Sequence, residues 1–588
     1  MRHCPSAGSR RYALGVVVGA LLIACARKPP TYPLTKHAEP FAKRFEYQAD
    51  SAPSVADGVT AARITRARTE PHNWLTYYGT YDGWRYSPLD QINATNVRQL
   101  RPAWVFQYAM LGLMANPVTY AFEAAPIVVD GVMYVTGPNG YVWALDAANG
   151  SKLWQYQHQI PIDVPLCCGN VNRGAAVAQG KVFFVTANGL LIALDARRGT
   201  AVWSAPFVDP RAGESATVAP LVVKNLVIVG SSGAEYGVRG HLDAFDVATG
   251  RRVWRRYTVP KPGEPGSETW DLPRAWERGG GTAWITGTYD PELDLLYWGT
   301  ANPSPVFSGK ERPGDNHFTS GVLALDPDDG SIRWFYQWTP HDVWDYDGVG
   351  ESILFEEGDR KLLAHFDRNG YFFVLDRTNG RFVRATRFAR ADWADIDERT
   401  GRVTNRKEPT KEGRRICPGP AGAKVWNHAA YHPTRNLFFV PVIELCATFR
   451  ASDDYFREGL PYMGSTFVNT NEESWGHVKA FDAATGREVW AWRGLAPIVS
   501  SILATAGDLV FAGEPSGMVN AYHAGTGEVL WQFQTGSGIH SNPVSYSVNG
   551  KQFVAVPSGW GGWLEGFAPK NYGAPRGSAL FVFALPTP

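Results

Sequence analysis

The feature that most constrains the fold is a short motif that recurs along most of the chain. It consists of an apolar pair, an Asp, a few turn-forming residues, a Gly and, after a short linker, a Trp; the first copy contains Asp146, Gly150 and Trp154. One copy carries Arg384 where the Trp is expected. Strand-like apolar runs flank the copies, so each Asp/Gly turn is predicted to join two strands of a hairpin. Later copies begin at Asp195, Asp246, Asp326, Asp376, Asp482 and His523.

The spacing of the copies predicts an all-β fold, an eight-bladed β-propeller. Several copies lie about 50 residues apart, which is typical of four-stranded blades. The wider gaps at 246–326 and 376–482 leave room for insertions or a degenerate blade. Seven copies, together with a pairing of segment 104–106 with segment 579–582, predict eight blades. Most of the repeated Trp residues are then expected to dock one blade on the next through their large apolar area.

The composition excludes some classes of function but does not identify the function. The chain has 57 Lys and Arg against 56 Asp and Glu, a net charge of +1, which provides no general basic field for a nucleic-acid or anionic-membrane partner. β-Propellers serve as binding platforms, assembly scaffolds and enzymes, so the fold alone does not decide the function. The argument therefore rests on particular residues.

The N-terminus is interpreted as an export signal. Basic residues precede an apolar run at 12–26, which at about 15 residues is shorter than the roughly 20 that a membrane-spanning helix needs. The run ends in Leu22-Ile23-Ala24-Cys25, which resembles a bacterial lipoprotein processing site; ordinary secretory cleavage with Cys25 incidental is the alternative. We therefore expect a signal peptide at 1–24, a linker at 25–70 and the propeller at 71–588, in a periplasmic protein whose membrane contact is a lipid on Cys25.

Four cysteines of the exported chain are expected to form two disulfides in an oxidising compartment. They are Cys167, Cys168, Cys417 and Cys446. A bridge between the adjacent Cys167 and Cys168 closes a tight, strained ring, and strained backbone tends to be kept at functional sites. The alternative is that each of these two cysteines reaches Cys417 or Cys446.

The segment 166–174, Leu-Cys-Cys-Gly-Asn-Val-Asn-Arg-Gly, resembles the vicinal-disulfide motif of the pyrroloquinoline-quinone (PQQ) dependent alcohol dehydrogenases. The resemblance continues through Asn73-Trp74, 85–89 and 91–93 and covers nearly all of the chain after about residue 70. It implies an eight-bladed periplasmic propeller that oxidises a primary alcohol, or a related alcohol or aldehyde, by hydride transfer to PQQ. It also implies the disulfides Cys167–Cys168 and Cys417–Cys446.

The resemblance implies how PQQ is held. The Cys167–Cys168 ring would cover one face of the planar cofactor and Trp284 the other, although Trp284 could instead be another docking Trp. Arg173 would bind the carboxylates of the cofactor, because a guanidinium can do so bidentately. Further cofactor-binding positions are implied at Glu123, Thr217, Ser232, Gly233, Ala234 and Thr282.

A metal site is also implied. Glu235 and Asn302 match the metal ligands of the family, and ligands that are all oxygen indicate a hard cation. Asp345 matches the catalytic base. Asp347 lies two residues on, on the same side of what is expected to be an extended segment, and a second Asp there accompanies lanthanide dependence in the family. Calcium, with Asp347 a solvated turn residue, is the alternative. Arg368 matches an Arg that hydrogen-bonds the quinone and the base.

The resemblance implies a redox partner. The chain contains no Cys-x-x-Cys-His haem motif, so a separate cytochrome c is the expected electron acceptor. The oligomeric state stays open, with a homodimer as one option.

Two departures from the family put substrate choice in doubt. Relatives usually have Asn where Val425 stands, so either Asn427 substitutes from a shifted register or that contact is lost. Many relatives have Trp where Val499 stands, and the two changes predict a roomier pocket than methanol needs. The competing hypotheses are a non-catalytic propeller lipoprotein that scaffolds outer-membrane assembly, and a pseudo-enzyme that binds PQQ without turnover.

Overall fold

The computed structural model describes residues 58–108, 122–161, 164–469, 474–562 and 576–586. The chain divides into two units, Met1–Gln48 and Ala49–Pro588, and the propeller lies in the second. The predicted signal peptide and Cys25 lie outside the described residues. Among the described residues, no helix has both the length and the apolar character that crossing a membrane would require.

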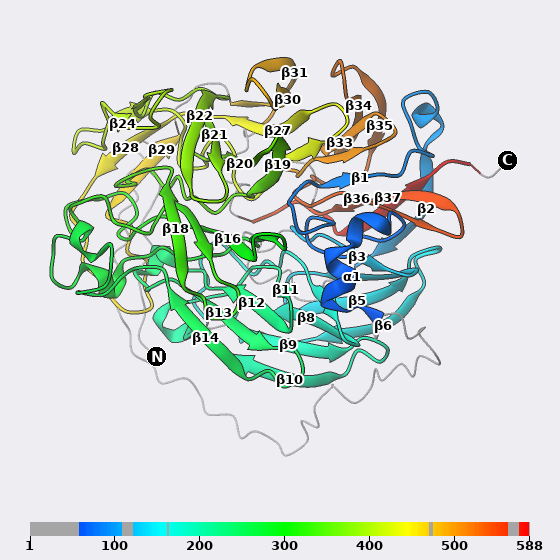
Figure 1. Cartoon of the computed structure of the whole chain (residues 1–588), viewed down its shortest axis with the longest axis horizontal. Coiled ribbons are helices and arrows are strands. Elements are labelled where there is room, and N and C mark those ends of the chain that lie inside the picture. Colours follow the sequence, from blue (N-terminus) through cyan, green and yellow to red (C-terminus); the bar gives the residue numbers. More distant parts are fainter. Residues whose placement is uncertain (1–57, 109–121, 162–163, 470–473, 563–575, 587–588) are drawn as a thin grey trace, which may run out of the picture. The chain divides into compact units, whose positions relative to one another are not determined.

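Eight four-stranded antiparallel sheets form the blades of a β-propeller within the described residues, as predicted (Figure 1). The first four are β3 (Ile127–Val129), β4 (Val132–Thr136), β5 (Tyr141–Asp146), β6 (Lys152–Gln157); β7 (Ala176–Ala178), β8 (Lys181–Val185), β9 (Leu190–Asp195), β10 (Ala201–Pro206); β11 (Leu221–Val223), β12 (Leu226–Gly230), β13 (His241–Asp246), β14 (Arg252–Tyr257); β15 (Thr288–Asp290), β16 (Leu295–Thr300), β17 (Gly321–Leu325), β18 (Ile332–Gln337).

The next four blades follow the same plan, and β1 (Tyr86–Ser87) adds a parallel strand to the seventh, beside β32. They are β19 (Ile353–Glu357), β20 (Arg360–Phe366), β21 (Tyr371–Asp376), β22 (Arg381–Arg387); β26 (Ala430–His432), β27 (Leu437–Glu444), β30 (Trp475–Asp482), β31 (Glu488–Gly494); β32 (Leu503–Thr505), β33 (Leu509–Gly513), β34 (Met518–His523), β35 (Val529–Gln534); β36 (Val544–Val548), β37 (Lys551–Ser558), β38 (Ala579–Ala584) and β2 (Arg101–Gln107).

The recurring motif is the turn between the third and fourth strands of a blade, and its Trp docks that blade on the next. Trp490 on β31 donates its indole N–H to the carbonyl of Ala524 at 2.9 Å, in the turn of the next blade, and its ring lies over Gly527 of that turn. The docking role predicted for the repeated Trp is confirmed by the same bond elsewhere: Trp104 to Ala147, Trp154 to Ala196, Trp203 to Val247, Trp254 to Pro327 and Trp531 to Leu100.

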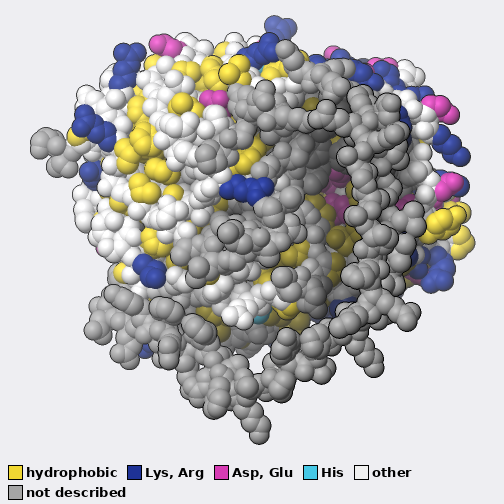
Figure 2. Space-filling model, turned by 180° about the vertical axis from the view of Figure 1, so that it is seen from behind, with side chains coloured by type: hydrophobic (Ala, Val, Ile, Leu, Met, Phe, Trp, Pro, Cys, Tyr) yellow, Lys and Arg dark blue, Asp and Glu magenta, His cyan; other side chains and the backbone are white. Residues whose placement is uncertain are grey.

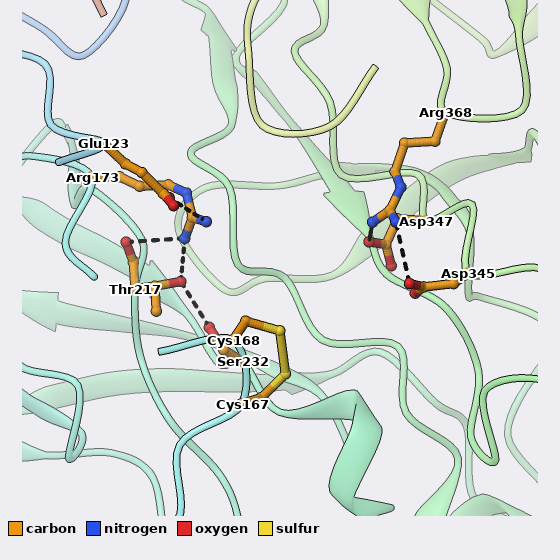
Figure 3. Close-up of a disulfide and its surroundings, with 9 residues drawn as sticks. All are labelled: Glu123, Cys167, Cys168, Arg173, Thr217, Ser232, Asp345, Asp347 and Arg368. Carbon is orange, nitrogen blue, oxygen red and sulfur yellow. Dashed lines mark hydrogen bonds and ion pairs between the residues drawn. A yellow bond between two sulfur atoms is a disulfide. The ribbon is translucent and has the colours of Figure 1, made fainter. Parts of the chain in front are cut away.

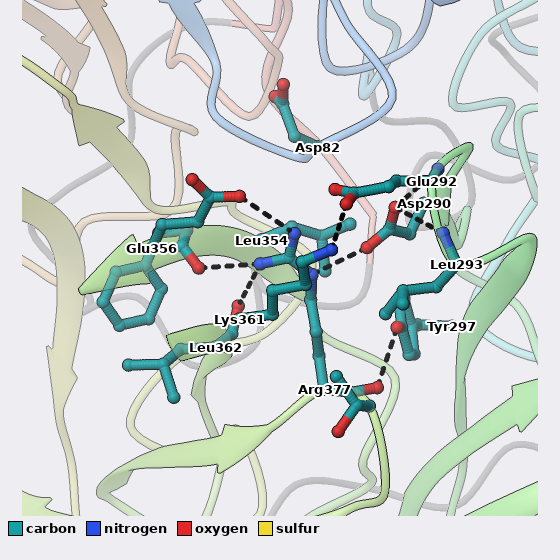
Figure 4. A network of polar contacts seen from close by, with 12 residues as sticks. Asp82, Asp290, Glu292, Leu293, Tyr297, Leu354, Glu356, Lys361, Leu362 and Arg377 are labelled. Atoms are coloured by element: carbon teal, nitrogen blue, oxygen red, sulfur yellow. Dashed lines mark hydrogen bonds and ion pairs between the residues drawn. The ribbon is translucent and has the colours of Figure 1, made fainter. Parts of the chain in front are cut away.

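The fifth blade shows how the pattern adapts where its sequence departs. Arg384 donates from its guanidinium to the carbonyl of Ala483, the position that a Trp N–H reaches elsewhere. On the other side of this blade, the carbonyl of Arg377 accepts from Tyr297 at 2.9 Å, and the Arg377 guanidinium pairs with Asp290 at 2.7 Å (Figure 4). Polar contacts thus connect the fourth and fifth blades where the docking indole of Trp334 has no hydrogen-bond partner among the described residues.

The first and last parts of the propeller close it by sharing a blade. β2 forms the outer strand of the eighth blade and pairs antiparallel with β38, with Val105 opposite Phe581 and Phe106 opposite Leu580. This is the pairing that the sequence predicted for 104–106 and 579–582. The contact lets strands far apart in the sequence bury a common core, because Phe583 and Val582 are fully buried there.

The two wide gaps between motif copies contain insertions and no degenerate blade within the described residues. Between β22 and β30 the chain forms the hairpin β23 (Asp395–Ile396)–β24 (Val403–Thr404) and a separate sheet of β25 (Arg414–Ile416), β28 (Ala447–Ala451) and β29 (Ser465–Asn469). Between β14 and β17 the extra residues form long connections.

The described part of the predicted linker packs on the propeller. The short helix α1 (Ala61–Thr65) buries Ile64, and Val59 accepts a backbone hydrogen bond from Gln179 at 2.9 Å. Arg63 pairs with Asp130 at 2.6 Å. Residues 58–70 are therefore attached to the first two blades.

Blade topology determines which loops share a face. In an antiparallel four-stranded sheet, the loop from the second to the third strand and the connection from the fourth strand to the next blade leave from the same end. The Asp/Gly turns, between third and fourth strands, leave from the other end. Side chains from up to eight blades can therefore meet on one face, near the propeller axis.

Candidate functional site

The predicted site residues all lie in loops of that one face, although they are spread over some 250 positions of the sequence. Glu123, Cys167–Arg173, Thr217, Trp284, Asp345 and Asp347 lie in connections between blades. Ser232–Glu235, Asn302 and Arg368 lie in loops from a second to a third strand.

A cavity of about 390 Å³ brings most of these side chains together. Its walls include the predicted residues Cys167, Cys168, Arg173, Thr217, Ser232, Gly233, Glu235, Trp284, Asp345, Asp347 and Arg368. Ala234 is buried in the turn that carries Glu235. Glu123 and Asn302 lie behind the wall and reach it through neighbours described below, and Thr282 is buried two positions before Trp284.

At one end of the cavity Cys167 and Cys168 form a disulfide (Figure 3). Cys417 and Cys446 form a second disulfide, which excludes the alternative pairing. Cys168 has a φ of 62°, in the left-handed region that residues with a β-carbon seldom adopt. The two sulfur atoms and a carboxylate oxygen of Glu235 lie within 4.8 Å of one another. The ring therefore presents its sulfur edge next to a predicted metal ligand.

Arg173 supplies the positive charge of this end. Its guanidinium pairs with Glu123 at 2.8 Å, donates to the hydroxyl of Thr217 and lies 4.6 Å from the centre of the Trp284 ring. Thr217 in turn lies 3.2 Å from the Ser232 hydroxyl (Figure 3). Burial raises the pKa of Glu123 to about 7, an effect that Arg173 opposes. Trp284 is thus placed against the cavity and, among the described residues, makes no blade-docking bond of the kind described above.

At the opposite end Arg368 bridges two aspartates. Its guanidinium contacts the carboxylates of Asp345, at 3.3 Å, and Asp347, and also donates to the carbonyl of Pro420 at 2.5 Å. Asp347 accepts the backbone N–H of Asn302 at 2.6 Å. Asn302 is thereby tied to the aspartates although its side chain is not part of the wall.

The segment that carries both aspartates is not extended, so the prediction made for it was wrong in this respect. Asp345 and Asp347 have φ values of 68° and 46°. The reason is Asp342, whose carboxylate accepts the N–H groups of Trp344, Tyr346 and Asp347 at 2.9–3.1 Å and draws the chain into a tight turn. Both carboxylates still reach Arg368. Sequence reasoning missed Asp342, although it stands three residues before Asp345 in the same motif.

Burial of these carboxyl groups favours their protonated forms. The pKa of Asp345 is raised well above its usual value by burial, with Arg368 opposing the shift. Burial raises the pKa of Asp347 to about 6 and that of Glu235 to about 7. A cation beside these oxygens would reverse this preference, because a nearby opposite charge favours ionised carboxylates.

The residues present fit a polar planar cofactor and a hard cation. Within the described part of the chain, Arg173 Nε, Arg368 Nε, Thr282 Oγ1 and Asn302 Oδ1 are buried without a hydrogen-bond partner. Buried polar atoms are normally satisfied, so these groups indicate a ligand. Glu235, Asp345 and Asp347 supply only oxygen, the donor that hard cations prefer. They line the same cavity, although their oxygen atoms do not all lie within 4.8 Å of one another.

The departures at 425–427 can now be located. Val425 and Trp426 line the cavity, whereas the Asn427 amide is buried and bonded to the N–H of Val425 at 2.7 Å and the carbonyl of Ile498 at 2.8 Å. Asn427 therefore does not substitute for the missing Asn. Val499 is buried in the same hydrophobic cluster as Val425 and Trp426.

A buried carboxylate that sequence reasoning missed supports this wall. Glu351 accepts from Lys424 Nζ at 2.7 Å, His428 Nδ1 at 3.0 Å and the N–H of Ala429 at 2.9 Å, so it clamps both ends of the segment that carries Trp426. Burial alone would raise the pKa of Glu351, but Lys424 and His428 lower it to about 2. No sequence motif marked Glu351.

Comparison with known proteins places this geometry in a family. The model of the glucose/ethanol/alcohol dehydrogenase β-propeller domain matches residues 74–388, and that of the outer membrane protein assembly factor BamB matches 474–559. Quinoprotein alcohol dehydrogenase PedH of Pseudomonas putida is 39% identical over 567 residues, covering 90% of this chain and 93% of that protein. The lanthanide-dependent methanol dehydrogenase of Methylacidiphilum fumariolicum is 38% identical over 540 residues, covering 85% and 87%.

Solved structures of similar proteins lead to the same family. A europium-containing methanol dehydrogenase superposes with a TM-score of 0.84 at 36% identity, over 89% of this chain and all of that one. The quinohemoprotein alcohol dehydrogenase ADHIIG from Pseudomonas putida superposes with a TM-score of 0.85 at 35% identity, over 91% of this chain and 84% of that one. The chain therefore belongs to the PQQ-dependent alcohol dehydrogenases.

Proposed function

We propose that this protein oxidises a primary alcohol, or a related alcohol or aldehyde, with PQQ and a metal ion bound in the 390 Å³ cavity. The observation that carries the proposal is the arrangement of the cavity. The vicinal disulfide, Trp284 and Arg173 line it together with Asp345 and Arg368. A non-catalytic scaffold has no need of this combination.

Residues of the cavity would have separate roles in binding the cofactor and in moving the proton. The disulfide and Trp284 offer rigid apolar surfaces to a flat ring, and Arg173 offers a fixed positive charge to carboxylates. Asp345 is the base that takes the hydroxyl proton of the alcohol, and Arg368 holds its carboxylate. PQQ, when bound, supplies the carbonyl group that accepts the hydride from the alcohol carbon.

The metal would be held by Glu235, Asn302, Asp345 and Asp347. We favour a lanthanide over calcium, since three carboxylates suit a trivalent ion. Burial raises the pKa of each carboxyl group, and a cation of either charge would reverse this effect. When bound, the ion supplies Lewis-acid polarisation of an oxygen in the reacting group.

The proposal also covers the electron acceptor and the cellular location of the protein. A separate cytochrome c would accept the electrons, and the apolar run before Cys25 supports export to the periplasm with a lipid on Cys25. Mass spectrometry of the membrane-associated protein should find a diacylated N-terminal Cys25, and an unmodified N-terminus elsewhere in 20–40 would refute the lipid anchor.

The central experiment is reconstitution of the apoprotein with PQQ and either La³⁺ or Ca²⁺, followed by dye reduction with a panel of alcohols and aldehydes. We expect alcohol-dependent turnover that is lost in Asp345→Asn, while PQQ binding, read from quenching of tryptophan fluorescence, is retained. Failure to bind PQQ would refute the enzyme. Binding without turnover by the native chain would favour the pseudo-enzyme.

The choice of ion is tested separately. Asp347→Ala should abolish turnover with La³⁺ and weaken the binding of Eu³⁺ measured by its luminescence. Equal turnover with Ca²⁺, or an Asp347→Ala variant as active as the native protein in La³⁺, would exclude lanthanide dependence.

A further inference from the structure

The cavity has an apolar outer wall that none of the predicted site residues supplies. Leu166, Phe307, Pro461 and Met463 line it together with the charged groups. Pro461 and Met463 belong to a loop, residues 452–464, that connects β28 and β29 of the inserted three-stranded sheet. The insertion thus contributes to a pocket otherwise built from the blade loops.

Loop 452–464 is held in shape by hydrogen bonds and an aromatic contact between its own residues. The Asp454 carboxylate accepts the N–H groups of Met463 at 3.0 Å and Gly464 at 3.1 Å, and Ser452 donates to the carbonyl of Gly464 at 3.2 Å. Phe456 packs edge-on against Tyr462, with 5.8 Å between ring centres. The loop closes on itself in the manner of an Ω-loop, so its position does not depend on the strands alone.

The loop also bridges the two segments that carry predicted metal ligands. The N–H of Tyr462 donates to the carbonyl of Glu235 at 2.6 Å, and the carbonyl of Met463 accepts the N–H of Phe307, five residues after Asn302, at 2.8 Å. Pro461 and Met463, on either side of Tyr462, therefore line the cavity next to the segments that carry Glu235 and Asn302. They line the same cavity as Asp345, the proposed base, so an alcohol whose hydroxyl contacts Asp345 has both side chains available to the rest of its body.

We propose that loop 452–464 is the specificity wall of the alcohol site, and that Met463, with Pro461, contacts the part of the substrate remote from its hydroxyl. The occupant is an alcohol with an apolar body larger than methanol, such as a longer alkyl or an arylalkyl alcohol. A methionine suits this place because its flexible thioether adapts to alkyl and aromatic shapes. This inference rests on the proposed function.

The test compares Met463→Trp, Met463→Ala and Leu460→Ala in the protein loaded with PQQ and La³⁺. Leu460 is the matched control, since it lies on the same loop, is 44% exposed and does not line the cavity. For 2-phenylethanol, Met463→Trp should lower kcat/KM at least about 10-fold and Met463→Ala should raise KM several-fold with kcat little changed. For ethanol both should stay within about 3-fold, and Leu460→Ala should match the native protein throughout.

A binding measurement tests the proposed contact without relying on turnover. The tertiary alcohol 2-methyl-4-phenyl-2-butanol has no hydrogen on its carbinol carbon and cannot give a hydride, so calorimetry reports its affinity alone. Met463→Ala and Met463→Trp should each weaken it about 10-fold or more. If Met463→Trp does not fold, Met463→Ala and Pro461→Ala carry the test.

Two failures are distinguishable. A native protein that turns over no alcohol refutes the proposed function. A native protein that is active, with Met463 variants that change all alcohols by one factor or leave the tertiary alcohol's affinity unchanged, refutes the specificity wall.

Discussion

At the scale of single residues, the interior holds polar groups that neither pair nor face a predicted ligand, and His540 is the clearest. It is fully buried, its ring lies 4.1 Å from that of Trp560, and neither ring nitrogen has a hydrogen-bond partner among the described residues. Burial lowers its pKa to about 3. The imidazole is therefore neutral in the folded protein at every pH at which the enzyme would work.

This residue predicts a pH-dependent difference in stability. Because the folded pKa lies below the unfolded value, the unfolded chain binds more protons between about pH 6.5 and 3, and stability falls as the pH falls through that range. His540→Phe keeps an aromatic ring but cannot titrate. Relative to the native protein, its free energy of unfolding should gain about 2 kcal/mol between pH 8 and pH 5. Urea unfolding at the two pH values measures this; parallel changes in the two proteins would contradict it.

At the scale of elements, one contact is repeated from blade to blade: a Trp of the fourth strand lies over the Gly of the next turn. Gly527 has a φ of 74°, and a β-carbon there would come within 2.5 Å of the Trp490 ring. Gly550 has the same φ with nothing within 4 Å of that position. Substitutions at these two glycines therefore separate the energetic cost of a left-handed backbone from the cost of disturbing the Trp docking contact.

The pair predicts the size of the docking contribution. Gly550→Ala should cost about 1–2 kcal/mol, the penalty of a left-handed residue with a β-carbon. Gly527→Ala should cost at least about 1 kcal/mol more, because the Trp must move. In a Trp490→Ala background that excess should vanish. A double-mutant cycle by urea unfolding checks this, and an excess that persists without Trp490 would show that the clash lies elsewhere.

At the scale of the whole molecule, the eighth blade joins the two ends of the propeller through β2 and β38. Phe583 on β38 is fully buried and packs on Trp531 and Phe533 of the seventh blade, at 5.1 and 5.0 Å between ring centres. Val105 on β2 of the same blade is 48% exposed. The closing blade thus carries a buried row of side chains on β38 that packs it on the seventh blade.

Phe583→Asp should open this closure, since it buries an unpaired carboxylate among aromatic rings. We expect hydrogen exchange to accelerate across β2 and β37 together and the thermal midpoint to fall, whereas Val105→Asp should change neither appreciably. Exchange that accelerates in β38 alone would mean that the ring remains closed without this row.

The sequence alone determined the blade number, the docking role of the repeated Trp and the family motifs, because a turn motif and its flanking strands are local patterns read within about ten residues. It could not give the turn at 345–347, where Asp342 overrides the expected extended backbone, nor the loss of the Asn contact at Val425, which depended on where the Asn427 amide finds its partners. The sequence also could not predict that Glu351 supports the cavity wall or that loop 452–464 contributes to the cavity. These depend on contacts between residues up to about 230 positions apart, such as Tyr462 with Glu235, and such contacts are decided only when the blades close and the loops of one face compete for the same space.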